Sequence, residues 1–177
     1  MCGTPLSDRQ KAPASPAGQR EERKNVTVLF IDLVDSTALA EAIDPEPLRQ
    51  ITDRYFAGCS AAIAEHGGVV EKFIGDAVVA VFGATVSHED DAVRAIRAAE
   101  ASLAALAALA AELPARPAIS LAARCGICSG EVVVITTAHG DVRVVGDAAN
   151  TASRLQSAAR PGQTMSRWNG PRGAPSG

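Results

Sequence analysis

Two acidic residues stand where apolar strands are expected to end, and carboxylates in such places can bind hard metal cations. Asp32 follows residues 26–31, a run of apolar and β-branched side chains that predicts a central β-strand. Asp76 lies in a turn at residues 74–76, at the tip of a predicted hairpin over residues 67–83, whose second strand, at residues 77–82, is apolar at every position and is the third strand of the chain. Each acid also has a simpler interpretation, because Asp32 could cap the following helix and Asp76 could stabilise the turn.

The order of the expected elements decides between these interpretations. The chain predicts β-α-β-β-α-β with further strands at the end, which is the ferredoxin-like arrangement of an α+β fold, with an antiparallel sheet and helices on one face. In this topology the third strand pairs antiparallel with the first, so Asp32 and Asp76 should converge at one edge of the sheet. Two converging carboxylates repel each other unless a cation lies between them. The pair therefore predicts a site for Mg²⁺ or Mn²⁺.

Apolar periodicity and capping residues predict the other elements. They are a helix over residues 45–66, a long Ala-rich helix from about residue 89 to 113, a second hairpin over residues 119–135 that turns near 129–131, a strand over 141–145 and a helix over 146–157. Three consecutive acids, Glu89, Asp90 and Asp91, resemble a metal cluster in composition. They fall in the first turn of the long helix, where the macrodipole favours acidic side chains, so we assign them to the helix start.

The last predicted helix carries a second pair of functional candidates. Asn150 and Arg154 are four residues apart and therefore lie on one face of this helix. An amide beside a guanidinium can hold a sugar and a phosphate, although a solvated helix face is the simpler interpretation. Combined with a metal pair, these residues point to phosphoryl transfer on a nucleotide.

Composition narrows the class of protein. The 177 residues suffice for one domain, and 47% hydrophobic residues with a net charge of −3 are typical of a globular protein. Mild acidity and 3% aromatic residues argue against nucleic acid as a partner. Without a membrane-spanning run or a signal-peptide core, we expect a cytoplasmic protein with no membrane partner. Cys125 and Cys128 fall on a predicted strand, where residues three apart face opposite ways, so a zinc or redox pair is not expected.

Over about residues 25–165, these motifs resemble the class III adenylate/guanylate cyclase catalytic domain of bacterial type. Residues 30–37 are similar to its first metal motif, residues 72–76 to its base-selecting Lys and second metal Asp, and residues 145–154 to its transition-state motif. By this resemblance, Asp32, Asp76 and the backbone carbonyl of Leu33 hold two Mg²⁺ or Mn²⁺ ions. The 3′-hydroxyl of ATP or GTP then attacks the α-phosphorus, and pyrophosphate leaves.

The resemblance also implies which residues bind the substrate. Lys72 contacts the purine and Gly75 belongs to the same substrate-binding hairpin, while Asn150 orients the ribose and Arg154 stabilises charge on the α-phosphoryl group. Arg143 falls at the second base-contacting position, where the family has Asp or Thr. Lys72 favours ATP, since an ammonium donates to adenine N1, and the extra cation at Arg143 weakens this preference. In the family, metal ligands and the remaining residues come from different chains, which implies a homodimer.

The two ends of the chain predict where the catalytic domain stops. Residues 1–24 and 166–177 are rich in Pro, Gly and polar residues and are expected to be disordered tails, which leaves residues 25–165 as a C-terminally shortened domain, with further regulatory domains expected in a longer form. The shortened end and Arg143 favour an alternative, a regulatory or dimerisation module with weak or no turnover. A polymerase-like or cyclic-dinucleotide enzyme is disfavoured, because residues 74–77 lack the Gly-Gly-acid-acid pattern.

Overall fold

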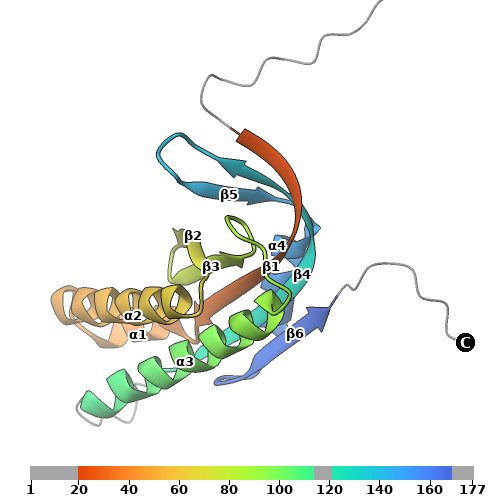
Figure 1. Ribbon diagram of the computed structural model, residues 1–177. Coiled ribbons are helices and arrows are strands. Elements are labelled where there is room, and N and C mark those ends of the chain that lie inside the picture. The colour runs from red at the N-terminus through yellow and green to blue at the C-terminus, as the bar shows by residue number, and fades with distance from the viewer. Residues whose placement is uncertain (1–19, 114–120, 169–177) are drawn as a thin grey trace, which may run out of the picture.

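The computed structural model describes residues 20–113 and 121–168, which form four helices and six strands (Figure 1). In chain order these are β1 (Arg20–Leu33), α1 (Ser36–Ala42), α2 (Pro45–Glu65), β2 (Val69–Ile74), β3 (Ala77–Phe82), α3 (Asp91–Glu112), β4 (Ala123–Thr136), β5 (Val142–Val145), α4 (Asp147–Ala158) and β6 (Thr164–Trp168). None of the described helices is long and apolar enough to cross a membrane.

The sheet has the order predicted for a ferredoxin-like core. Its strands run β2-β3-β1-β4-β5, and β6 pairs parallel with β4 beside β5. Strand β1 is antiparallel to both β3 and β4, so the predicted pairing of the first and third strands is confirmed. The α+β class and the extra C-terminal strands are confirmed with it.

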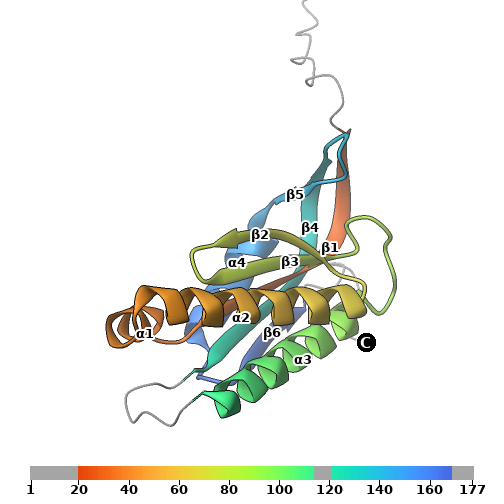
Figure 2. The ribbon, with the colours of Figure 1, turned by 90° about the vertical axis from the view of Figure 1, so that its left-hand side faces the viewer.

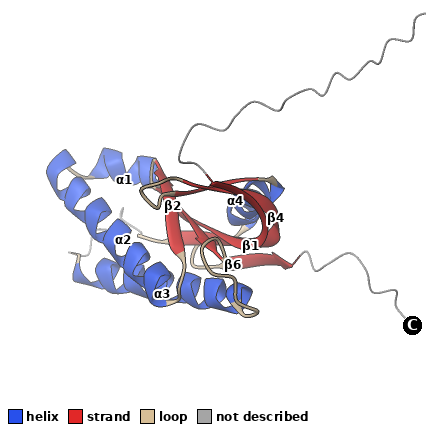
Figure 3. Cartoon of the chain, turned by 45° about the horizontal axis from the view of Figure 1, so that its top comes forward, coloured by secondary structure: helices blue, strands red, loops and turns tan. Residues whose placement is uncertain are grey.

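Two apolar clusters hold the sheet, one on each face. Figure 3 shows α2 and α3 on one side of the sheet and α4 on the other. Helices α2 and α3 pack against Leu29, Ile31 and their neighbours on one face, whereas α4 covers Val28 and Val132 on the other. The prediction that helices cover one face holds for α2 and α3 and is wrong for α4. The helix α4 can lie directly on β4 because Gly126 has no side chain, since a Cβ there would come within 2.0 Å of the Ala152 carbonyl oxygen.

The sheet curls strongly, so that its two edges approach each other. The start of β1 and the β4–β5 hairpin bend over the β2–β3 hairpin (Figures 1 and 2). Although β2 and β5 stand at opposite ends of the strand order, they are in contact. The curl thus produces a half-closed sheet instead of a flat one.

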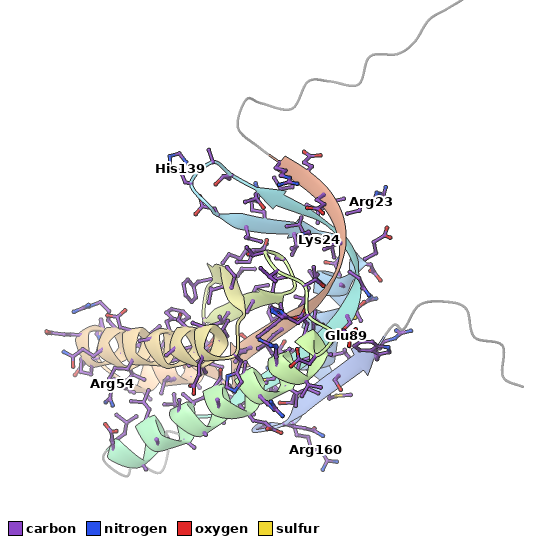
Figure 4. All side chains as sticks on the ribbon, in the orientation of Figure 1. Arg23, Lys24, Arg54, Glu89, His139 and Arg160 are labelled. Carbon is purple, nitrogen blue, oxygen red and sulfur yellow. The ribbon has the colours of Figure 1, made fainter. Side chains whose placement is uncertain are left out.

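The predicted N-terminal tail is too long. Strand β1 begins at Arg20, and its charged residues 20–24 pair with Val132–Thr136 of β4. Side chains support this polar stretch, because Arg23 Nη1 donates to Glu131 Oε1 at 3.0 Å and Lys24 Nζ donates to the Ala84 carbonyl at 2.9 Å (Figure 4). Pairing with β4 and these side-chain contacts extend the strand although residues 20–24 are all charged. The composition of residues 20–24 alone does not reveal such pairing. Residues 1–19 lie outside the described part.

The predicted second hairpin is also wrong, because β4 is one continuous strand. Residues 129–131, expected to turn, pair in register with residues 25–27 of β1, and Thr27 Oγ1 and Ser129 Oγ lie 2.8 Å apart. The glycine that suggested a turn faces α4, where a Cβ would lie 3.4 Å from that of Ala148. Gly130 therefore serves helix packing and not a reversal of the chain. Cys125 and Cys128 lie in the clusters on opposite faces, as predicted.

The predicted C-terminal tail starts too early. Ser166–Trp168 continue β6 and pair parallel with residues 127–129 of β4. Residues 169–177 lie outside the described part of the chain.

The long helix begins at Asp91, so only this one of the three consecutive acids occupies its first turn. Asp91 is buried, and its Oδ2 accepts the backbone N–H of His88 at 2.9 Å, which confirms a structural role for this acid.

Candidate active site

The two acids of the predicted metal pair lie at the same end of the sheet. In the β1–β3 ladder Ile31 pairs with Val78, so Asp32, the next residue of β1, lies at the end of the sheet where Asp76 leads into β3. Asp76 occupies the turn with Gly75, whose φ of 62° is readily adopted by glycine. A Cβ on Gly75 would meet no atom within 4 Å, so the space beside this turn is open. The fold therefore produces the juxtaposition that the topology predicted.

Asp32 is held in a partly buried and electrostatically strained position. Its Oδ2 accepts a hydrogen bond from Gln156 Nε2 at 2.9 Å and lies 3.7 Å from Arg124 Nη2. Burial and the neighbouring charge of Asp76 raise the pKa of Asp32. Arg124 and Gln156 lower this pKa, but by less than the other two causes raise it, so it stays above its ordinary value. The carboxylate is thus oriented by α4 and β4, yet not neutralised by them.

The residues present suit a divalent cation that is shared with a phosphate ligand. Among the described residues there is no cluster of three or more His, Cys, Asp or Glu side chains that could enclose a metal. Asp32, Asp76 and the main-chain carbonyl of Leu33 provide only oxygen donors, and too few of them to complete an octahedral shell. Mg²⁺ and Mn²⁺ commonly bind to one or two carboxylates and complete their shells with water and substrate phosphates. The donor set fits such ions.

The two candidate base-contacting residues stand on different faces of the sheet. Lys72 pairs with Val79 in the β2–β3 ladder, on the face where Val79 packs with Val142 and Val144. Arg143 lies between these two valines on β5 and is exposed, so its side chain points to the opposite face. One chain therefore does not place both cations on a common face.

Asn150 and Arg154 share one face of α4, as predicted, and this face points away from the sheet. Each is two residues from Ala152, which is fully buried, and at about 100° per residue both lie about 160° around the helix axis from it. Arg154 is 73% exposed, and its hydrogen bond and ion pair within the described residues stay in its own helix, with Nη2 at 3.3 Å from Thr151 Oγ1 and 3.7 Å from Asp147 Oδ1. Asp32 lies on the sheet side of α4, through Gln156. A single chain thus separates the amide–guanidinium pair from the acids.

Two residues beside the acids were missed from sequence. Arg124 lies directly across from Asp32 in the β1–β4 ladder, and its Nε is buried with no hydrogen-bond partner among the described residues. Gln156 is buried on the sheet side of α4, and its own Oε1 accepts from Ser157 Oγ at 3.2 Å. The sequence offers two signals, since Arg124 is a cation in an apolar strand and Gln156 is a polar residue on the apolar side of a helix. Neither signal points to Asp32 unless the β1–β4 register and the packing of α4 are known.

The strain on Asp32 predicts a stability gain on its removal. Because the folded-state pKa is raised above the ordinary value, ionised Asp32 opposes folding above that raised pKa, and the penalty disappears as pH falls below the ordinary value. In the metal-free protein, Asp32→Asn should therefore raise the melting temperature at pH 7 by a small amount. The amide oxygen can still accept from Gln156. Melting curves at neutral and acidic pH test this, and a gain that grows on acidification would contradict it.

Comparison with known proteins places this geometry in a family. The adenylate and guanylate cyclase catalytic domain matches residues 19–166. Two curated relatives are the adenylate cyclase of Anabaena cylindrica, 32% identical over 137 residues, and adenylate cyclase 1 of Rhizobium meliloti, 32% identical over 142 residues. These matches cover 75% and 78% of this chain, but only 27% and 21% of the relatives' lengths.

Solved structures agree with this assignment. The guanylyl cyclase Cya2 is similar with a TM-score of 0.74 and 31% identity, covering 82% of this chain and 75% of that one. The adenylyl cyclase CyaB from P. aeruginosa gives a TM-score of 0.72 and 28% identity, covering 83% of this chain and 78% of that one. With its strand order, its converging acids and these likenesses, the chain belongs to the adenylate and guanylate cyclase catalytic domain family.

Proposed function

We propose that this chain converts a purine nucleoside triphosphate, ATP in preference to GTP, into the 3′,5′-cyclic nucleotide and pyrophosphate, at a site shared by two copies of the chain. The observation that carries the proposal is the separation of Asp32 and Asp76 from the outward face of α4. Asn150 and Arg154 can meet the acids of a second copy, although not those of their own chain. An isologous dimer would form two such sites.

In this proposal, Asp32, Asp76 and the Leu33 carbonyl hold two Mg²⁺ or Mn²⁺ ions. When bound, such ions supply Lewis acidity for the attacking 3′-hydroxyl and the triphosphate. Gln156 and Arg124 both contact Asp32 Oδ2, which leaves Oδ1 available as a ligand. The raised pKa of Asp32 supports the assignment, since a cation would relieve the repulsion from Asp76.

The remaining residues bind the substrate. Arg124 lies beside the acids, and its buried Nε has no hydrogen-bond partner within residues 20–113 and 121–168, so we assign its guanidinium to neutralising the triphosphate there. Across the dimer, Asn150 orients the ribose and Arg154 stabilises negative charge on the α-phosphoryl group as the new O–P bond forms and the bond to pyrophosphate breaks.

Base selection is assigned to the two edge strands. The exposed ammonium of Lys72 donates to adenine N1, which favours ATP. Arg143 remains the second base-contacting candidate. Within one chain it points to the face opposite to Lys72, so we assign the preference for ATP to Lys72. Gly75 keeps the hairpin tip open to substrate.

Product analysis tests the proposed reaction. The chain is incubated with Mn²⁺ and either ATP or GTP, and cyclic nucleotide and pyrophosphate are quantified. We expect equal amounts of both products and a higher kcat/KM for ATP. Formation of a nucleoside diphosphate and phosphate would contradict cyclisation. Binding of substrate without turnover would instead identify a regulatory or dimerisation module.

The proposal applies to a catalytic unit. The chain spans about a quarter of the length of the curated relatives it matches. We place its action in the cytoplasm as part of intracellular signalling, where ATP and GTP are available, with regulatory input from further domains of a longer protein.

A further inference from the structure

A single carboxylate connects the two edges of the curled sheet. Glu71 Oε1 accepts the backbone N–H of Val144 at 3.1 Å, although β2 and β5 are the first and last strands in the order β2-β3-β1-β4-β5. The same oxygen lies 3.3 Å from Lys72 Nζ. Glu71 therefore contacts both its neighbour Lys72 on β2 and the backbone of β5, the strand that carries Arg143.

The local backbone of β2 explains why this side chain points inward. The β2–β3 register shifts between Val70 and Lys72, so Glu71 is the extra residue of a β-bulge. As a result, Glu71 and Lys72 are adjacent in sequence and still reach each other through their side chains. Without the bulge, the alternation of the strand would send consecutive side chains to opposite faces.

The two side chains of this contact differ in their burial. The Glu71 side chain is 2% exposed, whereas that of Lys72 is 49% exposed. Glu71 Oε2 is buried with no hydrogen-bond partner among the described residues. A buried carboxylate needs compensation, and here it receives one backbone N–H and one ammonium. The buried carboxylate of Glu71 thus restricts the half-exposed side chain of Lys72.

We propose that Glu71 is a positioning residue for base selection, which aims the Lys72 ammonium at the purine and fixes the spacing between the two base-contacting strands. This inference rests on the proposed function, because it assumes that Lys72 contacts the base. The carboxylate itself does not touch substrate in this account. It acts by restricting Lys72 and by holding β5 through Val144 N–H.

The substitution Glu71→Gln separates the two contacts. The amide oxygen can still accept from Val144 N–H, so the bridge between the strands remains, whereas the charge that holds Lys72 is lost. Glu71→Ala removes both contacts. Glu71→Asp keeps the charge on a shorter side chain and provides a second variant with an acid at this place.

Binding of 2′,3′-dideoxy-ATP and 2′,3′-dideoxy-GTP in the presence of Mn²⁺ gives the readout. These nucleotides lack the attacking hydroxyl, so affinity can be measured by calorimetry whether or not the chain turns over substrate. Glu71→Gln should weaken dideoxy-ATP binding about 10-fold, as for loss of a hydrogen bond to a charged group, and change dideoxy-GTP binding much less. Its melting temperature should stay near that of the wild type, whereas that of Glu71→Ala should fall. Glu71→Asp should give an intermediate affinity ratio.

A double-mutant cycle with Lys72→Gln tests whether Glu71 affects base selection through Lys72. If Glu71 acts through Lys72, adding Glu71→Gln to Lys72→Gln should leave the ratio of the two affinities unchanged. An unchanged ratio in Glu71→Gln alone, or additive effects in the double variant, would overturn the inference and leave the cyclase proposal intact. If the wild type binds neither dideoxynucleotide, both proposals fail. Binding without cyclisation of ATP contradicts only the proposed reaction.

Discussion

Mixing the Asp32→Ala and Arg154→Ala variants should restore cyclase activity that neither variant has alone. In a mixed dimer, one site takes its acids from the first variant and its Arg from the second, and so carries both lesions. The other site carries neither. With equal amounts and random exchange, about half of the dimers are mixed and about a quarter of all sites are intact, by the symmetry of an isologous interface. Activity should approach about a quarter of the wild-type value.

Two features of the structure make this experiment interpretable. Arg154 is 73% exposed, and the polar contacts that the described part of the chain gives it lie within α4, so its removal should not disturb the fold. A matched control mixes Asp32→Ala with Asp76→Ala. Both lesions then lie on the acid side, every mixed site has one, and no activity should return. If the Asp32→Ala and Arg154→Ala mixture stays inactive while subunit exchange is demonstrated, the sites are not shared.

The second large effect concerns the metal. Asp76→Asn should lower kcat/KM by about 100-fold or more, because loss of one carboxylate removes a ligand from the metal site. It should also abolish the rise in melting temperature that Mn²⁺ gives the wild type, since a ligand that binds only the folded state stabilises it. The metal-free variant should be at least as stable as the wild type, because the repulsion between Asp76 and Asp32 is gone.

Glu89→Gln is the control for this prediction. Glu89 is exposed, and its substitution removes the same charge. It lies near the start of α3 (Figure 4), beside residues 25–27 of β1, whereas Asp32 stands at the other end of the β1–β3 ladder. Its activity and Mn²⁺ stabilisation should equal those of the wild type. An equal Mn²⁺ effect in the wild type and Asp76→Asn would show that the acids do not share a cation.

The core of the fold could be predicted because its signals are local or topological. Apolar strands, a helix starting at Pro45 and the β-α-β-β-α-β order were sufficient to pair β1 with β3 and to bring Asp32 beside Asp76. Gly130 was misinterpreted as a turn, because a glycine that admits a helix looks the same in sequence as one that reverses the chain. The ends of β1 and β6 are held by cross-strand pairing, which composition does not encode.

The environment of the site could not be predicted for a related reason. Arg124 and Gln156 reach Asp32 only through the β1–β4 register and the packing of α4, which bring residues distant in sequence together. Glu71 depends on a one-residue bulge and on the curl that brings β5 to β2. Such positions become visible only when side-chain directions are known.

The most direct test of the account is the specific activity measured over a range of chain concentrations, together with the dimer fraction at each concentration. Cyclic nucleotide and pyrophosphate formed from ATP with Mn²⁺ should rise per chain in proportion to the dimer fraction, and should vanish where only single chains remain. Activity per chain that stays constant down to the single-chain state would contradict a site built from Asp32 and Asp76 of one copy and Asn150 and Arg154 of the other.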